Sequence, residues 1–166
     1  MSTVAKAPSK CSEEEKKIFF QLVKSGGEVV LDGLEDRIRT AEMLVFHYDG
    51  NKLLGVAALK TPSSSRRNGV FQKSQANLPE DTFPFELGWV VVTLQYRGKG
   101  LSRCLVETAL QAADGQNVFA VSRVDNAFMH KTLERYGFTR EGRSYLSRRS
   151  THDLQLFVRL VTQPCI

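Results

Sequence analysis

The stretch QYRGKGLSRCLVETAL, from Gln95 to Leu110, decides the fold. It follows an apolar run, Trp89 to Val92, that is typical of a buried strand, and it continues into an apolar pattern typical of an amphipathic helix. Gly98 and Gly100 let the backbone turn tightly and bring its N–H groups close to a ligand. The start of a helix adds unpaired N–H donors and the positive end of the helix dipole. The sequence therefore predicts a strand, a turn and a helix that together bind an anion, most naturally a phosphate.

Two common phosphate-binding motifs do not fit this turn. The chain has no GxxxxGK[ST] pattern, and Arg103 stands where the dinucleotide fingerprint GxGxxG needs its third glycine. What remains is Q-x-x-G-x-G at a junction between strand and helix. A second pattern follows at Asn126 and continues with Leu133-Glu134 and Gly137-Phe138.

Taken together and in this order, the two patterns resemble the GNAT family, the Gcn5-related N-acetyltransferases. The resemblance is good over residues 40 to 160 and loose over the N-terminal residues that precede them. Leu-Glu at residues 133 and 134 is similar to the branch of ribosomal-protein N-terminal acetyltransferases. The resemblance implies a mixed α/β fold, with a twisted mixed sheet, a splayed central strand and flanking helices. The alternative is a generic α/β domain whose glycines serve only turns.

The resemblance also implies acetyl-CoA as cosubstrate and assigns the residues that would hold it. Val90, which would also stabilise the oxyanion through its N–H, and Val91 and Val92 would pair with pantetheine. The pyrophosphate would contact the backbone of Arg97, Gly98, Lys99, Gly100, Leu101 and Ser102, and Asn126 completes the set. A purely structural interpretation stays open, in which the valines are core and Arg97 and Lys99 are solvated charges.

Glu86 is the candidate catalytic base. It lies on an otherwise apolar strand, where burial of a carboxyl group raises its pKa toward a useful value. Its position before the turn resembles that of a glutamate that deprotonates the amine in many GNAT enzymes. A surface glutamate, or one that only binds the ammonium group of the substrate, is the alternative.

The general acid is where the sequence departs from the family pattern. Many members carry a tyrosine seven residues after the asparagine, and here that position is Leu133. His130, Ser122 and Tyr145 are substitutes without a specific pattern, and His130 is expected at the surface. A thiolate leaves without strong acid help because thiol pKa values are low, so the missing tyrosine does not abolish catalysis.

Composition places the chain among ordinary globular proteins. It is 42% hydrophobic and 25% charged, and its 166 residues predict one domain, over residues 13–166. Residues 1–12 are polar, with Pro8 and little to bury, and are expected to form a flexible tail. No apolar run is long enough to span a membrane and no signal peptide is visible, so a cytoplasmic location is expected. Cys11, Cys104 and Cys165 form no metal motif, and Cys104 is expected in the core.

The remaining segments predict the element order αα-ββ-β-α-β-α-ββ. Ser12 followed by three glutamates indicates a helix start, and a second short helix is expected over residues 31–39. Residues 43–48 and 52–60 predict a hairpin. Residues 61–82 are polar and are expected to form a long loop, either a flexible insertion or a lid over the substrate. The helix after the turn is expected to run from residue 99 to 114.

These observations predict an acyl-CoA-dependent N-acyltransferase that transfers acetyl to a primary amine by direct attack in a ternary complex. The acceptor would be a small amine, an amino-acid derivative or a peptide N-terminus, and a homodimer is compatible with the sequence. One alternative is a GNAT-fold module that binds acyl-CoA as a sensor without turnover. A nucleic-acid-binding protein ranks last, because the net charge of +5 comes from scattered residues that form no stripe.

Overall fold

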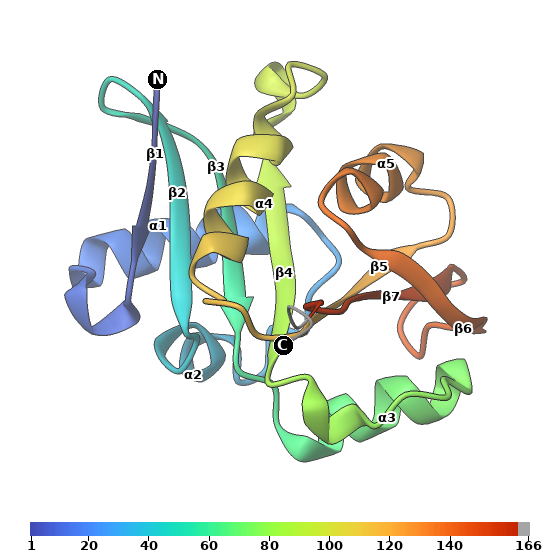
Figure 1. Ribbon diagram of the computed structural model, residues 1–166. Coiled ribbons are helices and arrows are strands. Elements are labelled where there is room, and N and C mark those ends of the chain that lie inside the picture. The colour runs from blue at the N-terminus through green and yellow to red at the C-terminus, as the bar shows by residue number, and fades with distance from the viewer. Residues whose placement is uncertain (163–166) are drawn as a thin grey trace. The chain divides into compact units, whose positions relative to one another are not determined.

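The computed structural model describes residues 1–162, in which the chain divides into two compact units. The first unit contains residues 1–61 and 87–114, and the second contains residues 62–86 and the part of the chain from residue 115 onward. Figure 1 labels their helices and strands. The mixed α/β fold class predicted from the sequence is confirmed.

The first unit contains helices and most of four strands, in the order β1-β2-β3-β4. Its elements are β1 (Ser2–Lys6), α1 (Glu13–Ser25), α2 (Leu34–Arg39), β2 (Met43–Asp49), β3 (Lys52–Lys60), β4 (Phe85–Val92, whose first two residues belong to the second unit) and α4 (Leu101–Gln111), with short 3-10 turns at Pro8–Lys10 and Leu94–Tyr96. The predicted hairpin of β2 and β3 is confirmed by their antiparallel pairing. Helix α4 packs against β1, β2 and β3.

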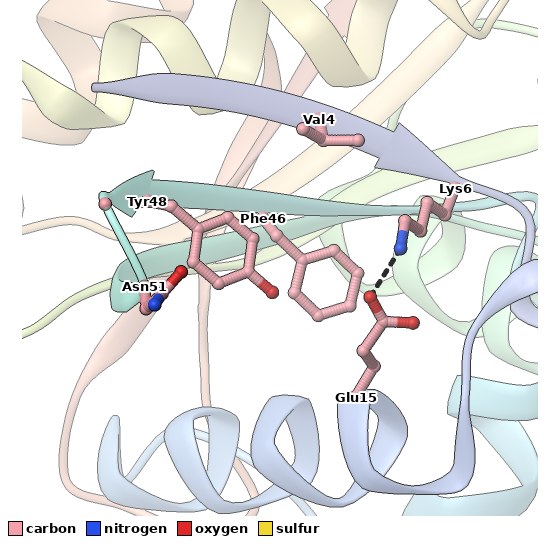
Figure 2. A pocket seen from close by; sticks show the side chains of 7 residues that line it. Val4, Lys6, Glu15, Phe46, Tyr48 and Asn51 are labelled. Atoms are coloured by element: carbon pink, nitrogen blue, oxygen red, sulfur yellow. Dashed lines mark hydrogen bonds and ion pairs between the residues drawn. The ribbon is translucent and has the colours of Figure 1, made fainter.

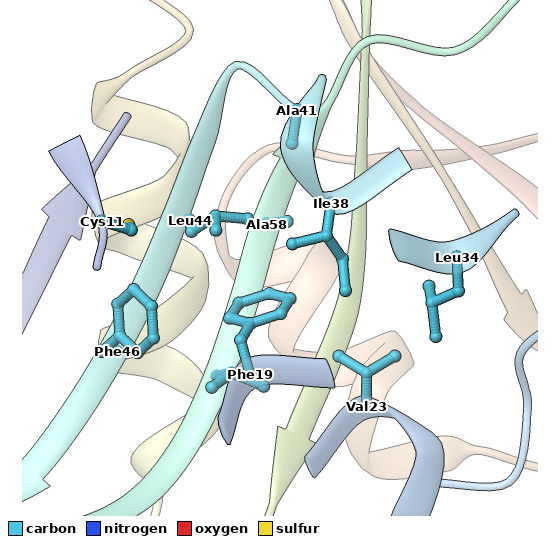
Figure 3. Packing of buried hydrophobic residues seen from close by; sticks show 10 residues of the cluster. Cys11, Phe19, Val23, Leu34, Ile38, Ala41, Leu44, Phe46 and Ala58 are labelled. Atoms are coloured by element: carbon cyan, nitrogen blue, oxygen red, sulfur yellow. The ribbon is translucent and has the colours of Figure 1, made fainter. Parts of the chain in front are cut away.

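The core of the first unit lies between α1, α2 and one face of the strands (Figure 3). Phe19 of α1 is fully buried and meets Phe46 of β2 and Trp89 of β4 edge to face, at centroid separations of 5.5 and 6.2 Å. The predicted start of α1 is also present, because Ser12 and Glu15 form a reciprocal capping box.

Strand β1 corrects the expectation of a flexible N-terminal tail. Residues 2–6 pair antiparallel with β2, with Val4 opposite Phe46. Most of the side chains of β1 are at least partly exposed, so no alternation of apolar residues marks the strand in the sequence. Its paired residues on β2 lie 38 to 46 residues further along the chain, and only folding brings the two strands together.

Cys104 also differs from expectation, because it is exposed on α4. The buried side chains of that helix are Leu101, Leu105, Val106, Ala109 and Leu110. Position 104 lies on the opposite side of a helix with 3.6 residues per turn.

His47 on β2 is buried, and burial lowers the pKa of its imidazole. Its Nδ1 lies 2.7 Å from the hydroxyl of Thr3 on β1, and its buried Nε2 has no hydrogen-bond partner among residues 1–162. The pKa of the His47 imidazole is therefore lower in the folded chain than in the unfolded chain, where it lies near 6.5.

We expect the free energy of unfolding to fall as the pH drops below about 6.5, because the unfolded state then binds one more proton than the folded state. One proton gives a slope of at most about 1.4 kcal/mol per pH unit. Urea unfolding between pH 7.5 and 5 measures this slope, and His47→Gln should make it shallower. A slope that His47→Gln leaves unchanged would contradict the assignment.

The second unit contains α3 (Ser64–Ser74), β5 (Val118–Arg123), α5 (Ala127–Arg135), β6 (Thr139–Leu146) and β7 (Asp153–Arg159), with a 3-10 turn at Glu80–Thr82. Its strands follow the order β5-β7-β6, and both neighbouring pairs are antiparallel. Phe71 of α3 lies between Phe83 and Phe119, at centroid separations of 5.2 and 5.5 Å.

Helix α3 corrects the expectation of a long loop over residues 61–82. The Ser63 side chain caps it by accepting a hydrogen bond from the N–H of Arg66. Its apolar contribution is small, chiefly Val70 and Phe71, so the helical period is hard to see in a polar segment. No helix in the described part of the chain is long and apolar enough to cross a membrane.

Candidate functional site

The turn between β4 and α4 has the backbone that the two glycines predict. Gly98 and Gly100 adopt φ angles of 76° and 77°, in the left-handed region, and Gly100 is the N-cap of α4 without a side-chain hydrogen bond. Within residues 1–162 the N–H groups from Gly98 to Ser102 have no intramolecular acceptor. Five donors are therefore left for an external anion at the positive end of a helix.

Three cations surround this turn. The Nε of Arg97 donates to the carbonyl of Val92 at 3.0 Å and so fixes that side chain across the turn. The ammonium groups of Lys52 and Lys99 each lie 4.9 Å from the ring centroid of Tyr96, and Lys52 also donates to the Tyr96 hydroxyl at 3.3 Å. The sequence does not indicate that Lys52 belongs to this site, because Lys52 lies at the start of β3, far from the glycine pattern.

Strand β4 has an irregular backbone at Trp89, whose φ is 50° although it is not glycine. A non-glycine residue with positive φ is uncommon, and in a strand it marks a bulge or strain. The indole packs in the core and lies under the ammonium of Lys60 at 4.9 Å. Val91 packs against the same core, so the side chains of Trp89 and Val91 are structural.

Glu86 is buried within the second unit, with a side chain that is 4% exposed. Arg66 of α3 forms a two-point ion pair with it, since Nη2 lies 2.9 Å from Oε1 and Nε lies 3.4 Å from Oε2. The charge of Glu86 raises the pKa of Arg66. Glu86 can be recognised in the sequence, whereas Arg66 cannot. The guanidinium of Arg66 favours the charged form of the carboxylate, which a base requires.

The substitutes for the missing acid differ in their surroundings. Tyr145 of β6 has a buried hydroxyl without a partner among the described residues, and burial raises its pKa. His130 is buried rather than at the surface, and its ring nitrogens contact the carbonyl of Arg123 at 2.8 Å and the guanidinium of Arg140 at 3.3 Å. Arginine only donates hydrogen bonds, so Nδ1 accepts from Arg140 and Nε2–H donates to the carbonyl of Arg123. Both ring nitrogens are used within the fold, so His130 is a structural residue.

Two further positions of the family pattern have structural roles in the second unit. Leu133 is 1% exposed and belongs to its interior. Asn126 caps α5, because its Oδ1 accepts a hydrogen bond from the N–H of Met129 at 3.2 Å. The cap uses only the oxygen of the amide, so the two N–H donors of Asn126 are left for a ligand.

The first unit also has a pocket of about 280 Å³ near α1, β1 and the turn of the β2–β3 hairpin (Figure 2). An ion pair of Lys6 and Glu15 lies beside the rings of Phe46 and Tyr48. None of its lining residues comes from the turn between β4 and α4, so this pocket is separate from the anion-binding geometry.

The family model described as "Acetyltransferase (GNAT) family" matches residues 10–138. No curated protein sequence matches the chain.

Many solved structures match the chain, among them the following three. An acyl-CoA N-acyltransferase from Pseudomonas aeruginosa is 18% identical, with a TM-score of 0.66 over 95% of this chain and 98% of that chain. The yncA protein of Salmonella typhimurium, solved with its cofactor acetyl-CoA, is 15% identical, with a TM-score of 0.66 over 100% and 98%. The ribosomal-protein-S18-alanine N-acetyltransferase of Escherichia coli is 11% identical, with a TM-score of 0.66 over 99% and 97%. At these identities the likeness establishes the fold.

Proposed function

Since the chain belongs to the acetyltransferase (GNAT) family, we propose that it transfers an acetyl group from acetyl-CoA to a primary amine by direct attack in a ternary complex. The observation that carries the proposal is the row of five unpaired N–H groups from Gly98 to Ser102, with cations around it. These donors, with Arg97 and Lys99, would hold the pyrophosphate of acetyl-CoA, as the sequence predicts. The backbone of Val90 to Val92 and the amide of Asn126 would complete the cofactor site.

Each catalytic role falls to a group of this chain. Glu86 would take a proton from the substrate ammonium, so that the neutral nitrogen can form the new C–N bond. The N–H of Val90 would stabilise negative charge on the carbonyl oxygen while the C–S bond breaks. Acetyl-CoA would supply the activated acetyl group, and coenzyme A would leave as a thiolate, which takes up, directly or through solvent, the second proton that the attacking nitrogen loses. No covalent intermediate on a cysteine is required.

The alternative, a sensor that binds acyl-CoA without turnover, rests on one observation. Leu133 is buried at the position where many family members carry a tyrosine acid. Consumption of acetyl-CoA, detected as free thiol against a panel of amines, amino acids and peptides, separates the two functions. Turnover with any acceptor supports the enzyme, and tight acetyl-CoA binding with no turnover supports the sensor. The cytoplasmic location and the homodimer remain predictions.

The turn itself is tested by Gly100→Ala. Alanine disfavours the left-handed backbone of Gly100, which directs the N–H of this residue at the anion. We expect acetyl-CoA affinity to fall by about tenfold, because one lost hydrogen bond to a charged group costs roughly 1.5 kcal/mol. Calorimetric titration with acetyl-CoA measures the change.

Gly115→Ala is the matched control for this substitution. Gly115 follows the other end of α4 with a φ of 75°, and an added Cβ meets no atom within 4 Å at either glycine. Both variants should lose similar stability through left-handed strain, about 1–2 kcal/mol. If both weakened acetyl-CoA binding equally, or if neither did, the assignment of the turn would be wrong.

A further inference from the structure

Within the second unit, Arg66 and Glu86 form more than a structural ion pair. The Arg66 side chain is 46% exposed while that of Glu86 is 4% exposed, so the pair has one open side, on the guanidinium. A guanidinium has five N–H donors, and two point at Glu86. The remaining donors of Arg66 have no acceptor among the described residues and can bind an incoming anion.

The surroundings of this pair carry excess positive charge. Lys73, on the same helix as Arg66, lies over the ring of Tyr145 at 6.0 Å. Its pKa is lowered by burial and by the positive charges of Arg148 and Arg66. Glu86 is the carboxylate that offsets them. Such a surface attracts an anionic group and repels a polycation.

Tyr145 adds a hydroxyl to the same cluster. The hydroxyl is buried without a partner among residues 1–162, and the charges of Arg66 and Glu86 both act on it. A buried hydroxyl left without a hydrogen bond costs about 1–3 kcal/mol. A ligand that carries an acceptor oxygen would remove that cost.

We propose, building on the acetyl transfer proposed above, that Arg66, Glu86 and Tyr145 select acceptors with a carboxylate next to the amine, namely free α-amino acids. Arg66 and Tyr145 receive the carboxylate, and Glu86 takes the proton of the amine beside it. The Arg66 and Glu86 atoms lie 2.9 Å apart, so the two binding positions are adjacent. An α-amino acid carries its nitrogen and its carboxylate carbon on the same atom and fits that spacing.

The test compares matched acceptors that differ only in the carboxylate. Each of the twenty amino acids is assayed with acetyl-CoA beside its amide and its decarboxylated amine. We expect the best amino acid to exceed its amide and its amine by at least tenfold in kcat/KM. Arg66→Gln should abolish this preference mainly through KM, Arg66→Lys should keep part of it, and Tyr145→Phe should reduce it severalfold.

Arg135→Gln serves as control, because Arg135 is an exposed arginine of the same unit. It should leave the preference intact, and unfolding curves should confirm that every variant is folded. Equal turnover of acid, amide and amine, better turnover of peptide N-termini or polyamines, or a preference that survives Arg66→Gln would overturn this inference and leave acetyl transfer standing. No acetyl-CoA consumption with any amine would overturn acetyl transfer itself, and the inference with it.

Discussion

Glu86→Gln should lower kcat/KM for acetyl transfer about a thousandfold near neutral pH, within the range of roughly 10² to 10⁴ that general-base catalysis contributes. Glutamine has the size of glutamate and can still accept a hydrogen bond from Arg66, so the fold should persist. It cannot take the proton of the attacking amine. An amine that is already neutral needs this step less, so the loss should shrink as the pH rises toward the pKa of the acceptor.

The measurement is the pH profile of kcat/KM for the wild type and the variant, with free thiol as the readout. Glu134→Gln is the matched control, since Glu134 is a half-exposed carboxylate of the same unit, 4.0 Å from Arg140. It should keep full activity. If Glu86→Gln stays within twofold of the wild type at every pH, Glu86 is not the base. A uniform loss at every pH would assign Glu86 to amine binding instead.

Gly142→Ala should destabilise the second unit by about 4 kcal/mol or more, an exceptional value for a single methyl group. A Cβ at this position would lie 2.1 Å from the carbonyl oxygen of Ser74 and 2.9 Å from its carbonyl carbon, and φ at Gly142 is +66°. The clashing atoms are backbone at the end of α3, and Ser74 is fully buried, so α3 cannot yield without losing its packing.

Urea unfolding of the purified variant measures this loss, and Gly137→Ala provides the comparison. Gly137 has a φ of +85°, but the nearest atom to an added Cβ is Arg159 Nε at 3.9 Å. That variant should lose only the cost of left-handed backbone, about 1–2 kcal/mol. Equal losses at both positions would show that the contact with Ser74 relaxes easily. Because α3 also carries Arg66, any folded fraction of Gly142→Ala should lose the preference for α-amino acids over their amides and decarboxylated amines.

The parts of the fold that could be predicted from sequence are those whose cause is local. Apolar residues at strand spacing, two glycines and an amphipathic pattern suffice for β4, the turn and α4. The capping box of Ser12 and Glu15 likewise lies within four residues. Strand β1 depends on distant backbone pairing with β2, and α3 owes its burial to Phe83 and Phe119, so neither has a strong local pattern.

The same distinction applies to the candidate site. Glu86 stands out as a carboxylate in an apolar run. Arg66 is twenty residues away, in a segment that looked like a loop, and only the folding of α3 against its unit places it on Glu86. Lys52 and Tyr96 are likewise forty-four residues apart. Contacts of this kind can be identified only in the folded chain, because the sequence around an arginine or a lysine does not show which residue it will contact.

The irregular backbone at Trp89 has a practical consequence. Trp89 is the one tryptophan of the 166 residues, and it lies on β4 immediately before Val90. Its indole is half-buried, with the ammonium of Lys60 4.9 Å from the ring. Indole emission responds to nearby charge and to water, so whatever binds along β4 should change the intrinsic fluorescence of the protein. Occupancy of the strand can therefore be followed by unlabelled fluorescence titration, even where no product forms.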